Sequence, residues 1–311
     1  MTPNSELSGL NTGLLVIAAL LPALILCIYV FKKDRAEKEP IGLLLGLLGL
    51  GAVICYPAAE VEGIFLSIIA ELFAPFTSSV GNDVYFSSHL SYIMYNVAEN
   101  FIGIALVEEG FKFLVLYLVT RKNKNFNSLF DGIIYSVFVS LGFAALENVL
   151  YVTQYGWGNA VVRALLSVPG HMFFAVFMGY YYTMWNLFSK ANALEKNYKA
   201  NGLIVPNATE FEYKNYLTLS LVMPVLAHGF YDFCCSVNYT IATIGLYVFV
   251  IFLYIYCFKK IKNMSKIDGD NNTLSFGLVL RKYPYLIEYF NRAAQTQAQN
   301  NTSYNTQQGG Y

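Results

Sequence analysis

Residues 105–119 read ALVEEGFKFLVLYLV, an apolar run that carries Glu108, Glu109 and Lys112 in its middle. The run is apolar enough to cross a lipid bilayer, yet each charge at bilayer depth costs about 3 kcal/mol. Charged side chains inside membrane helices are therefore rare, and they usually face a bundle interior or a water-filled cavity. The stretch predicts a membrane helix that contributes charged groups to an internal polar site.

The composition of the whole chain agrees with a membrane protein. Of its 311 residues, 56% are hydrophobic and only 13% are charged, whereas soluble domains are about 25% charged. The formal net charge is zero, which argues against a nucleic-acid partner because such proteins carry basic patches. The lipid bilayer is the expected environment.

Seven stretches approach the length of about 20 apolar residues that a transmembrane helix needs. They are residues 13–31, 41–58, 101–120, 130–153, 164–188, 216–237 and 239–258. Residues 61–76 are apolar but short, so they could lie at the interface, re-enter, or form an eighth span. We therefore predict an all-α polytopic membrane helix bundle of about seven transmembrane helices, or eight if residues 61–76 cross.

The basic residues predict the orientation and the domain division. They gather after the first, third, fifth and seventh predicted spans, while the alternate segments contain Arg163 alone. Because basic loops stay in the cytoplasm, the N-terminus is expected outside and the C-terminus in the cytoplasm. We expect residues 1–267 to form the bundle. Residues 268–311 would form a cytoplasmic tail, with a short amphipathic piece before a polar, disordered end.

Four predicted spans carry polar side chains at similar depth. Counted at about 1.5 Å per helical residue, Glu108, Glu147, His171, His228 and Asp232 lie roughly 7–13 Å below the outer ends of their spans. The four helices run in alternating directions, so a common depth indicates one shared site in the outer half of the membrane. The residues are Glu108, Glu109, Lys112, Glu147, Asn148, His171, His228 and Asp232.

The spacing and residue types limit the chemistry of this site. Lys112 lies four residues after Glu108 and three after Glu109, so it can neutralise either carboxylate. His228 and Asp232 share a helix face at the same four-residue spacing. One scheme binds a metal ion, since two imidazoles and a carboxylate form a catalytic zinc set. A second scheme needs no metal and uses a glutamate as general base on water.

Two other classes of function use the same residue types. A proton-coupled transporter or channel would use intramembrane Glu, His and Asp as a relay, and it would need a path through both halves of the membrane. The inner halves of these spans offer few ionisable groups, which argues against such a path. A receptor or scaffold would use the same groups as hydrogen bonds between helices.

Four motifs in order carry a resemblance to a known family. EExxK spans Glu108 to Lys112, and FxxxEN runs from Phe143 to Glu147 and Asn148. HxxF begins at His171, and HxxxD runs from His228 to Asp232. Over about residues 28–258 the sequence resembles the PrsW family of intramembrane proteases, distant relatives of the CAAX-processing proteases.

The resemblance implies hydrolysis of a peptide bond in a membrane-tethered protein with a single span. An anti-sigma factor, cut at the first site on the extracytoplasmic side of a bacterial plasma membrane, is the expected substrate. It further implies Glu108 as general base, Glu109 as its partner or alternate, and Lys112 as the residue that holds the pair. Asp232 would orient one imidazole. Glu147, His171 and His228 become metal ligands, with zinc as the expected ion, or groups that polarise the carbonyl.

Overall fold

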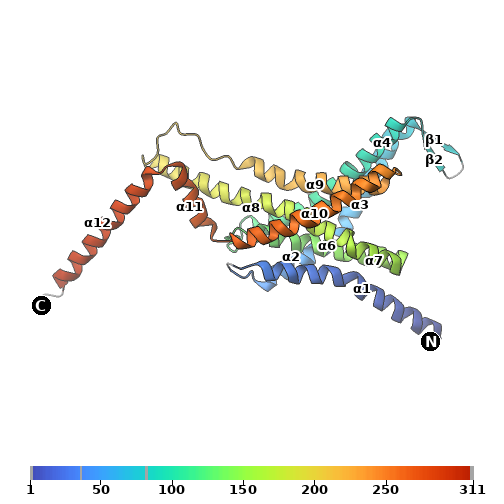
Figure 1. The fold of residues 1–311 in the computed structure, drawn as a ribbon, viewed down its shortest axis with the longest axis horizontal. Helices are drawn as coiled ribbons and strands as arrows, with labels where there is room; N and C mark the ends of the chain where they lie inside the picture. The colour runs from blue at the N-terminus through green and yellow to red at the C-terminus, as the bar shows by residue number, and fades with distance from the viewer. Residues whose placement is uncertain (1–2, 36, 81–82, 309–311) are drawn as a thin grey trace.

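The computed structural model describes residues 3–35, 37–80 and 83–308, and it is built almost entirely of helices (Figure 1). The first half contains α1 (Pro3–Lys33), α2 (Ile41–Val53), α3 (Cys55–Phe73), the 3₁₀ turn η1 (Ala74–Phe76), the strands β1 (Thr77–Val80) and β2 (Asp83–Phe86), α4 (His89–Val97), the π-helical η2 (Ala98–Ala105) and α5 (Leu106–Thr120). The second half contains α6 (Asp131–Tyr155), α7 (Trp157–Leu165), α8 (Ser167–Ala200), α9 (Lys214–Ser236), α10 (Thr240–Lys266), α11 (Asn271–Lys282) and α12 (Tyr285–Gln308).

Within the described residues, 6 helical segments are long and apolar enough to cross a membrane. They are Thr12–Lys33, Ile41–Phe76, Asp131–Tyr155, Trp157–Ala200, Lys214–Ser236 and Thr240–Lys266. The predicted span at residues 101–120 corresponds to η2 and α5, which continue from α4 and carry the three charges of the EExxK motif. The polytopic helical architecture is confirmed, while the count of seven or eight and the orientation stay predictions.

The helices lie lengthwise beside one another, and the two ends of the bundle differ (Figure 1). The first turns of α1, the helix α7 and the β1–β2 hairpin lie toward one end, and α11 and α12 lie at the other.

Residues 61–76, whose course the sequence left open between the interface, re-entry and an eighth span, lie mostly in helix α3. Helix α3 continues through this region to Phe73, the antiparallel pair β1–β2 forms a hairpin, and α4 follows. The helix forms because its apolar residues recur every three or four positions, as in an amphipathic helix. Residues 61–73 therefore extend the structure that surrounds the polar site.

Helix α6 occupies the centre of the bundle. Its residues from Asp131 to Ala144 are buried without interruption, as expected for a helix that is apolar on all sides. It crosses α2 very closely: a Cβ atom placed on Gly142 would lie 2.0 Å from the carbonyl oxygen of Leu48. Only glycine permits this approach, which fixes the depth at which α6 presents Glu147.

A set of buried carboxylates ties together the loops at the cytoplasmic end predicted from the sequence. Asp34, Glu39 and Asp131, here called the Asp131 cluster, are each at most 3% exposed. Asp131 accepts hydrogen bonds from the backbone N–H groups of Asn127 (2.8 Å) and Ser128 (2.6 Å). Glu39 accepts one from the hydroxyl of Tyr135 at 2.5 Å. These bonds attach the α1–α2 and α5–α6 loops to the start of α6.

The predicted tail begins with structure that contacts the bundle. Asn271 donates its backbone N–H to the carbonyl of Asn127 at 2.6 Å and its side-chain amide to Ser128 at 3.1 Å. Val279 of α11 is buried with Leu286 of α12 and Ala191 of α8. The predicted amphipathic piece thus forms α11 and the start of α12, whereas the domain boundary at residue 268 and the disorder of the chain end stay predictions.

Candidate active site

Helices α5, α6, α8 and α9 bring the predicted polar residues to one cavity of about 600 Å³. Glu108, Glu147, His171, His228 and Asp232 all line it. Glu109, Lys112 and Asn148 do not line it but lie directly behind residues that do. The common depth predicted from the sequence therefore corresponds to a real meeting of side chains, which we call the Lys112 cluster: Glu108, Glu109, Lys112, Glu147, Arg163, His171, His228 and Asp232.

Lys112 is the centre of this cluster, and its side chain is fully buried. Its Nζ lies 2.8 Å from Glu108 Oε2, 2.8 Å from Glu109 Oε1 and 3.2 Å from His171 Nδ1. The ring of Phe143 covers the ammonium from the side, at 4.2 Å from its centroid. One lysine thus holds both carboxylates of the EExxK motif and an imidazole from another helix.

The two glutamates of the motif have different surroundings. Glu108 is 6% exposed and reaches the cavity, whereas Glu109 is fully buried. The Oε1 atom of Glu109 lies 3.0 Å from His228 Nδ1, and its Oε2 atom is buried without a hydrogen-bond partner among the residues that the structure describes. Glu108 is therefore the glutamate that water in the cavity can reach.

The neighbours of the two histidines indicate their protonation. His228 faces carboxylate oxygens with both ring nitrogens, Glu109 at 3.0 Å and Asp232 at 3.1 Å. Two acceptors suit an imidazolium, which donates from both nitrogens. His171 faces the Lys112 ammonium with Nδ1 and Glu147 Oε2 with Nε2, at 2.9 Å. Because an ammonium can only donate, His171 Nδ1 is the acceptor in its contact with Lys112.

Arg163 is a member of the cluster that the sequence did not identify. It lies on α7, and its guanidinium is 3.1 Å from Glu147 Oε1. Asn148 accepts a hydrogen bond from Arg163 Nε at 2.8 Å and donates one to the carbonyl of Ala19 in α1 at 2.7 Å. Asn148 therefore positions Arg163 and does not face the cavity. The available sequence signal was that Arg163 is the single basic residue in the predicted outer segments.

Three further cavity-lining side chains were also missed. Glu62 comes from α3, Asn100 from η2 and Asn159 from α7. Asn100 accepts a hydrogen bond from the hydroxyl of Ser236 at 2.9 Å. All three lie in segments that the sequence suggested to be outer loops, so no helical pattern placed them near the site.

The Lys112 cluster contains more negative than positive charge. Glu108, Glu109, Glu147 and Asp232 face only two permanent cations, Lys112 and Arg163. An imidazolium at His228 reduces the excess but does not remove it. A buried excess of negative charge attracts a proton or a metal ion, because the low dielectric leaves it poorly solvated.

The donor atoms include a set with metal-binding spacing. Glu108, Glu109 and His171 each offer a ligand atom, and these atoms lie within 4.8 Å of one another. Of the metal ligands expected from the resemblance, His171 belongs to this set. Among the described residues, no group with this spacing contains Glu147 or His228. Carboxylate oxygens and imidazole nitrogen suit zinc, and the unpartnered Oε2 of Glu109 is a free donor, so the residues are compatible with the ion.

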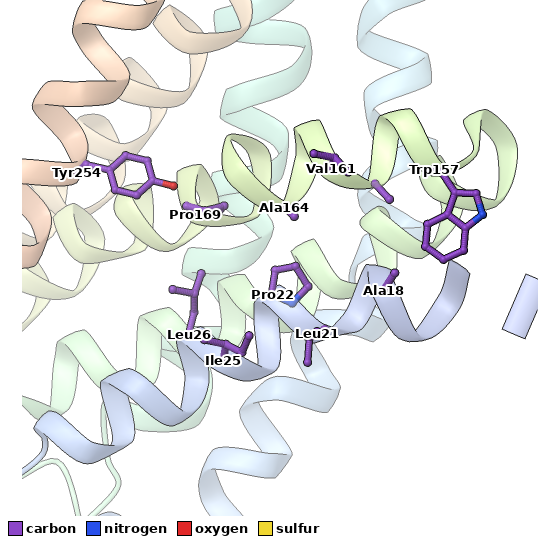
Figure 2. A pocket seen from close by; sticks show the side chains of 11 residues that line it. Ala18, Leu21, Pro22, Ile25, Leu26, Trp157, Val161, Ala164, Pro169 and Tyr254 are labelled. Carbon is purple, nitrogen blue, oxygen red and sulfur yellow. The ribbon is translucent and has the colours of Figure 1, made fainter. Parts of the chain in front are cut away.

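A second, apolar groove lies on the other side of α7 (Figure 2). Its volume is about 440 Å³, and Trp157, Val161 and Ala164 of α7 face Leu21 and Pro22 of α1 across it. Asn159, Val162 and Arg163 of the same helix line the polar cavity. One short helix therefore separates an apolar surface from the charged site.

Comparisons with known proteins agree with this geometry. Residues 39–257 match the model of the PrsW family intramembrane metalloproteases. The chain is 31% identical to Protease PrsW of Clostridioides difficile over 272 residues, which cover 86% of this chain and 97% of that protein. It is 30% identical to Protease PrsW of Bacillus subtilis over 256 residues, or 82% of this chain and 97% of that protein.

Protease PrsW of Oceanobacillus iheyensis is 31% identical over 249 residues, covering 80% of this chain and 95% of that protein. No solved structure matches the chain. The family match covers more than half of the chain, and the bacterial relatives are matched over nearly their whole length. Together with the apolar helices, these matches show that the chain is a multi-pass bacterial membrane protein that belongs to the PrsW family of intramembrane proteases.

Proposed function

We propose that the Lys112 cluster is the active site and that it hydrolyses a peptide bond of a membrane-tethered protein with an activated water. The observation that carries this proposal is the cavity itself. It places a water-accessible carboxylate, Glu108, beside two imidazoles and a guanidinium inside a helix bundle. In the predicted orientation this cavity lies in the extracytoplasmic half of the membrane.

Glu108 is the proposed general base. Lys112 holds its Oε2 atom at 2.8 Å and keeps the carboxylate oriented toward the cavity. A positioned base of this kind contributes about 10²–10⁴-fold to the rate. Glu108 takes a proton from water as the water oxygen bonds to the carbonyl carbon. The same proton then passes to the leaving amine as the C–N bond breaks.

His228 and Arg163 are the proposed stabilisers of the oxyanion that forms in this step. Both lie at the cavity wall, and Glu109 with Asp232 holds His228 in its charged form. Preorganised positive groups in a poorly solvated site stabilise a developing negative charge strongly. Asn148 supports this arrangement because it fixes the guanidinium of Arg163.

A zinc ion is proposed as the alternative to the Glu108 base, with Glu108, Glu109 and His171 as the residues that would hold it, and in that scheme Glu108 would be a ligand instead of the base. Such an ion supplies Lewis-acid chemistry and lowers the pKa of water. The Lys112 ammonium now lies against the same three side chains. A metal ion held by these side chains would replace the Lys112 ammonium as their positive partner. Glu147 keeps the ring of His171 oriented through its Nε2 atom.

The proposed substrate is a membrane protein with a single span, such as an anti-sigma factor. The apolar groove on the other side of α7 supports this choice, because an apolar helix could lie against α1 and α7 beside the catalytic cavity. The substrate backbone would then leave the lipid at the level of the Lys112 cluster.

The test combines cleavage with metal analysis in the full-length protein. Purified wild type, Glu108→Gln and Glu60→Gln are assayed in detergent with a panel of single-span reporters, and bound zinc is measured in each. Glu60 is an exposed acid of α3 outside the cavity, so its variant is the matched control. We expect cleavage by wild type and Glu60→Gln only. Cleavage by Glu108→Gln at the wild-type rate would refute the proposed base, and a zinc-free enzyme that resists chelation would refute the cofactor.

A further inference from the structure

One carboxylate in the catalytic cavity has no cation of its own. Glu108 pairs with Lys112 at 2.8 Å, Glu147 with Arg163 at 3.1 Å and Asp232 with His228 at 3.1 Å. Glu62 lines the same cavity and feels the charges of Glu108, Glu147, Asp232 and His228, but it makes no hydrogen bond or ion pair with any residue in 3–35, 37–80 or 83–308. Its charge is therefore available to a group that enters the cavity from outside the chain.

The position of Glu62 follows from the helical spacing of α3. Ala59, Glu62, Gly63 and Leu66 share the face of α3 that lines the cavity. Glu60 and Glu71 lie elsewhere on the helix, are exposed, and do not line it. Glu62 is half-buried, so its carboxylate is partly removed from water and gains more from a partner than a freely solvated one would.

The surroundings of Glu62 suit a long basic side chain. Ala59, Leu66 and Ile104 form an apolar wall beside it. Lysine and arginine place their methylene stems along such surfaces and extend the charged group to an acid. A metal ion suits the position less well, because Glu62 belongs to none of the groups of metal-binding spacing found among the described residues.

We infer that Glu62 is a specificity-determining residue, which binds a lysine or arginine side chain of the substrate close to the scissile bond. This inference rests on the proposed active site, because it places the substrate backbone in the cavity of the Lys112 cluster. Pairing with Glu62 stabilises the bound substrate and reduces the excess of negative charge in the cavity. A substrate with an acidic residue at that position is repelled by Glu62 and by the other carboxylates of the cavity.

The test uses a library of single-span reporters with randomised residues in the outer segment next to the span. Full-length wild type, Glu62→Gln, Glu62→Lys and the control Glu60→Gln cleave the library in proteoliposomes, and mass spectrometry identifies the products. We expect wild type to enrich Lys and Arg about fivefold to tenfold at one position near the cut, as a partly buried ion pair allows. Glu60→Gln should keep this preference, Glu62→Gln should lose it, and Glu62→Lys should favour Asp and Glu.

The outcomes separate the two proposals. Cleavage by wild type without basic enrichment, or an unchanged preference in Glu62→Gln, overturns the role of Glu62 and leaves the active site intact. Loss of all cleavage in Glu62→Gln also overturns it, because a specificity residue is dispensable for substrates without a basic residue. Cleavage by wild type that persists in Glu108→Gln overturns the proposed site on which the inference rests, and absence of cleavage by wild type overturns both.

Discussion

The Lys112 cluster and the Asp131 cluster are both rich in buried acids, yet they balance charge in opposite ways. In the Lys112 cluster each of the four carboxylates lies within 3.1 Å of a lysine, arginine or histidine nitrogen. In the Asp131 cluster the carboxylates receive backbone N–H groups and a tyrosine hydroxyl, and no ion pair involving them occurs in the described part of the chain. The first arrangement keeps charges available at neutral pH, whereas the second favours bound protons.

The pKa values of the carboxyl groups in the loop between α1 and α2 reflect this difference. Burial raises the pKa of Glu39 to about 7 and also raises that of Asp34. A carboxyl group whose folded pKa lies above its ordinary value stabilises the fold while it is protonated. The comparison teaches that a buried acid can serve catalysis when a cation faces it, and that without one it acts as a proton-dependent link between loops.

The largest expected effect is on activity in the Lys112 cluster. Glu108→Gln should lower the cleavage rate by about 10²–10⁴-fold, because the amide cannot accept a proton from water. Stability should change little, since Lys112 keeps Glu109 and His171 as partners. Initial rates and thermal unfolding of the purified variant check both parts. A rate within twofold of wild type would contradict the assignment.

The next effect is on stability. Lys112→Met should lower the free energy of unfolding by about 3–5 kcal/mol, because it leaves two buried carboxylates without their cation. Adding Glu108→Gln and Glu109→Gln should restore most of this loss while the protein stays inactive. Denaturant titration in detergent measures the free energies. Equal stability of the single and triple variants would show that the pairing charges do not matter.

A smaller effect is expected at the edge of the cavity. Arg163→Gln should reduce the cleavage rate by about 10²-fold, the lower end of what loss of one electrostatic stabiliser costs. Glu147 retains its contact with His171, so the fold should persist. Arg163→Lys should recover only part of the rate because lysine lacks the planar guanidinium that contacts both Glu147 and Asn148. A full recovery would favour a simple charge effect over positioning by Asn148.

The smallest effect belongs to the Asp131 cluster and depends on pH. Stability contributed by Glu39 is complete below its ordinary pKa of 4.5 and is lost as pH rises through about 7. Wild type should therefore lose about 1 kcal/mol over this range, after allowance for solvent screening. Glu39→Gln should flatten this pH profile, whereas the exposed neighbour Glu37→Gln should keep it. If the pH profile of stability were the same in Glu39→Gln as in wild type, Glu39 would not be the proton-dependent link between the loops.

The sequence predicted the helical membrane architecture and the meeting of the motif residues, because span length, charge and depth follow from local composition. It also suggested that Lys112 pairs with a glutamate, and the structure shows that it contacts both. It did not predict Arg163 or Glu62 at the site, since their positions depend on how α7 and α3 pack beside the cavity. The ligand set of a metal depends on side-chain rotation across helices, which helical spacing alone does not determine.

The three charges in α5 also affect how the chain is made. A segment with Glu108, Glu109 and Lys112 partitions into lipid poorly when it is alone. Its internal ion pairs lower that cost, but His171 and His228 arrive only with helices synthesised later. We therefore expect α5 to remain near the translocon during biosynthesis until α6 and α8 follow, so that the charged segment enters the lipid together with the helices that enclose it.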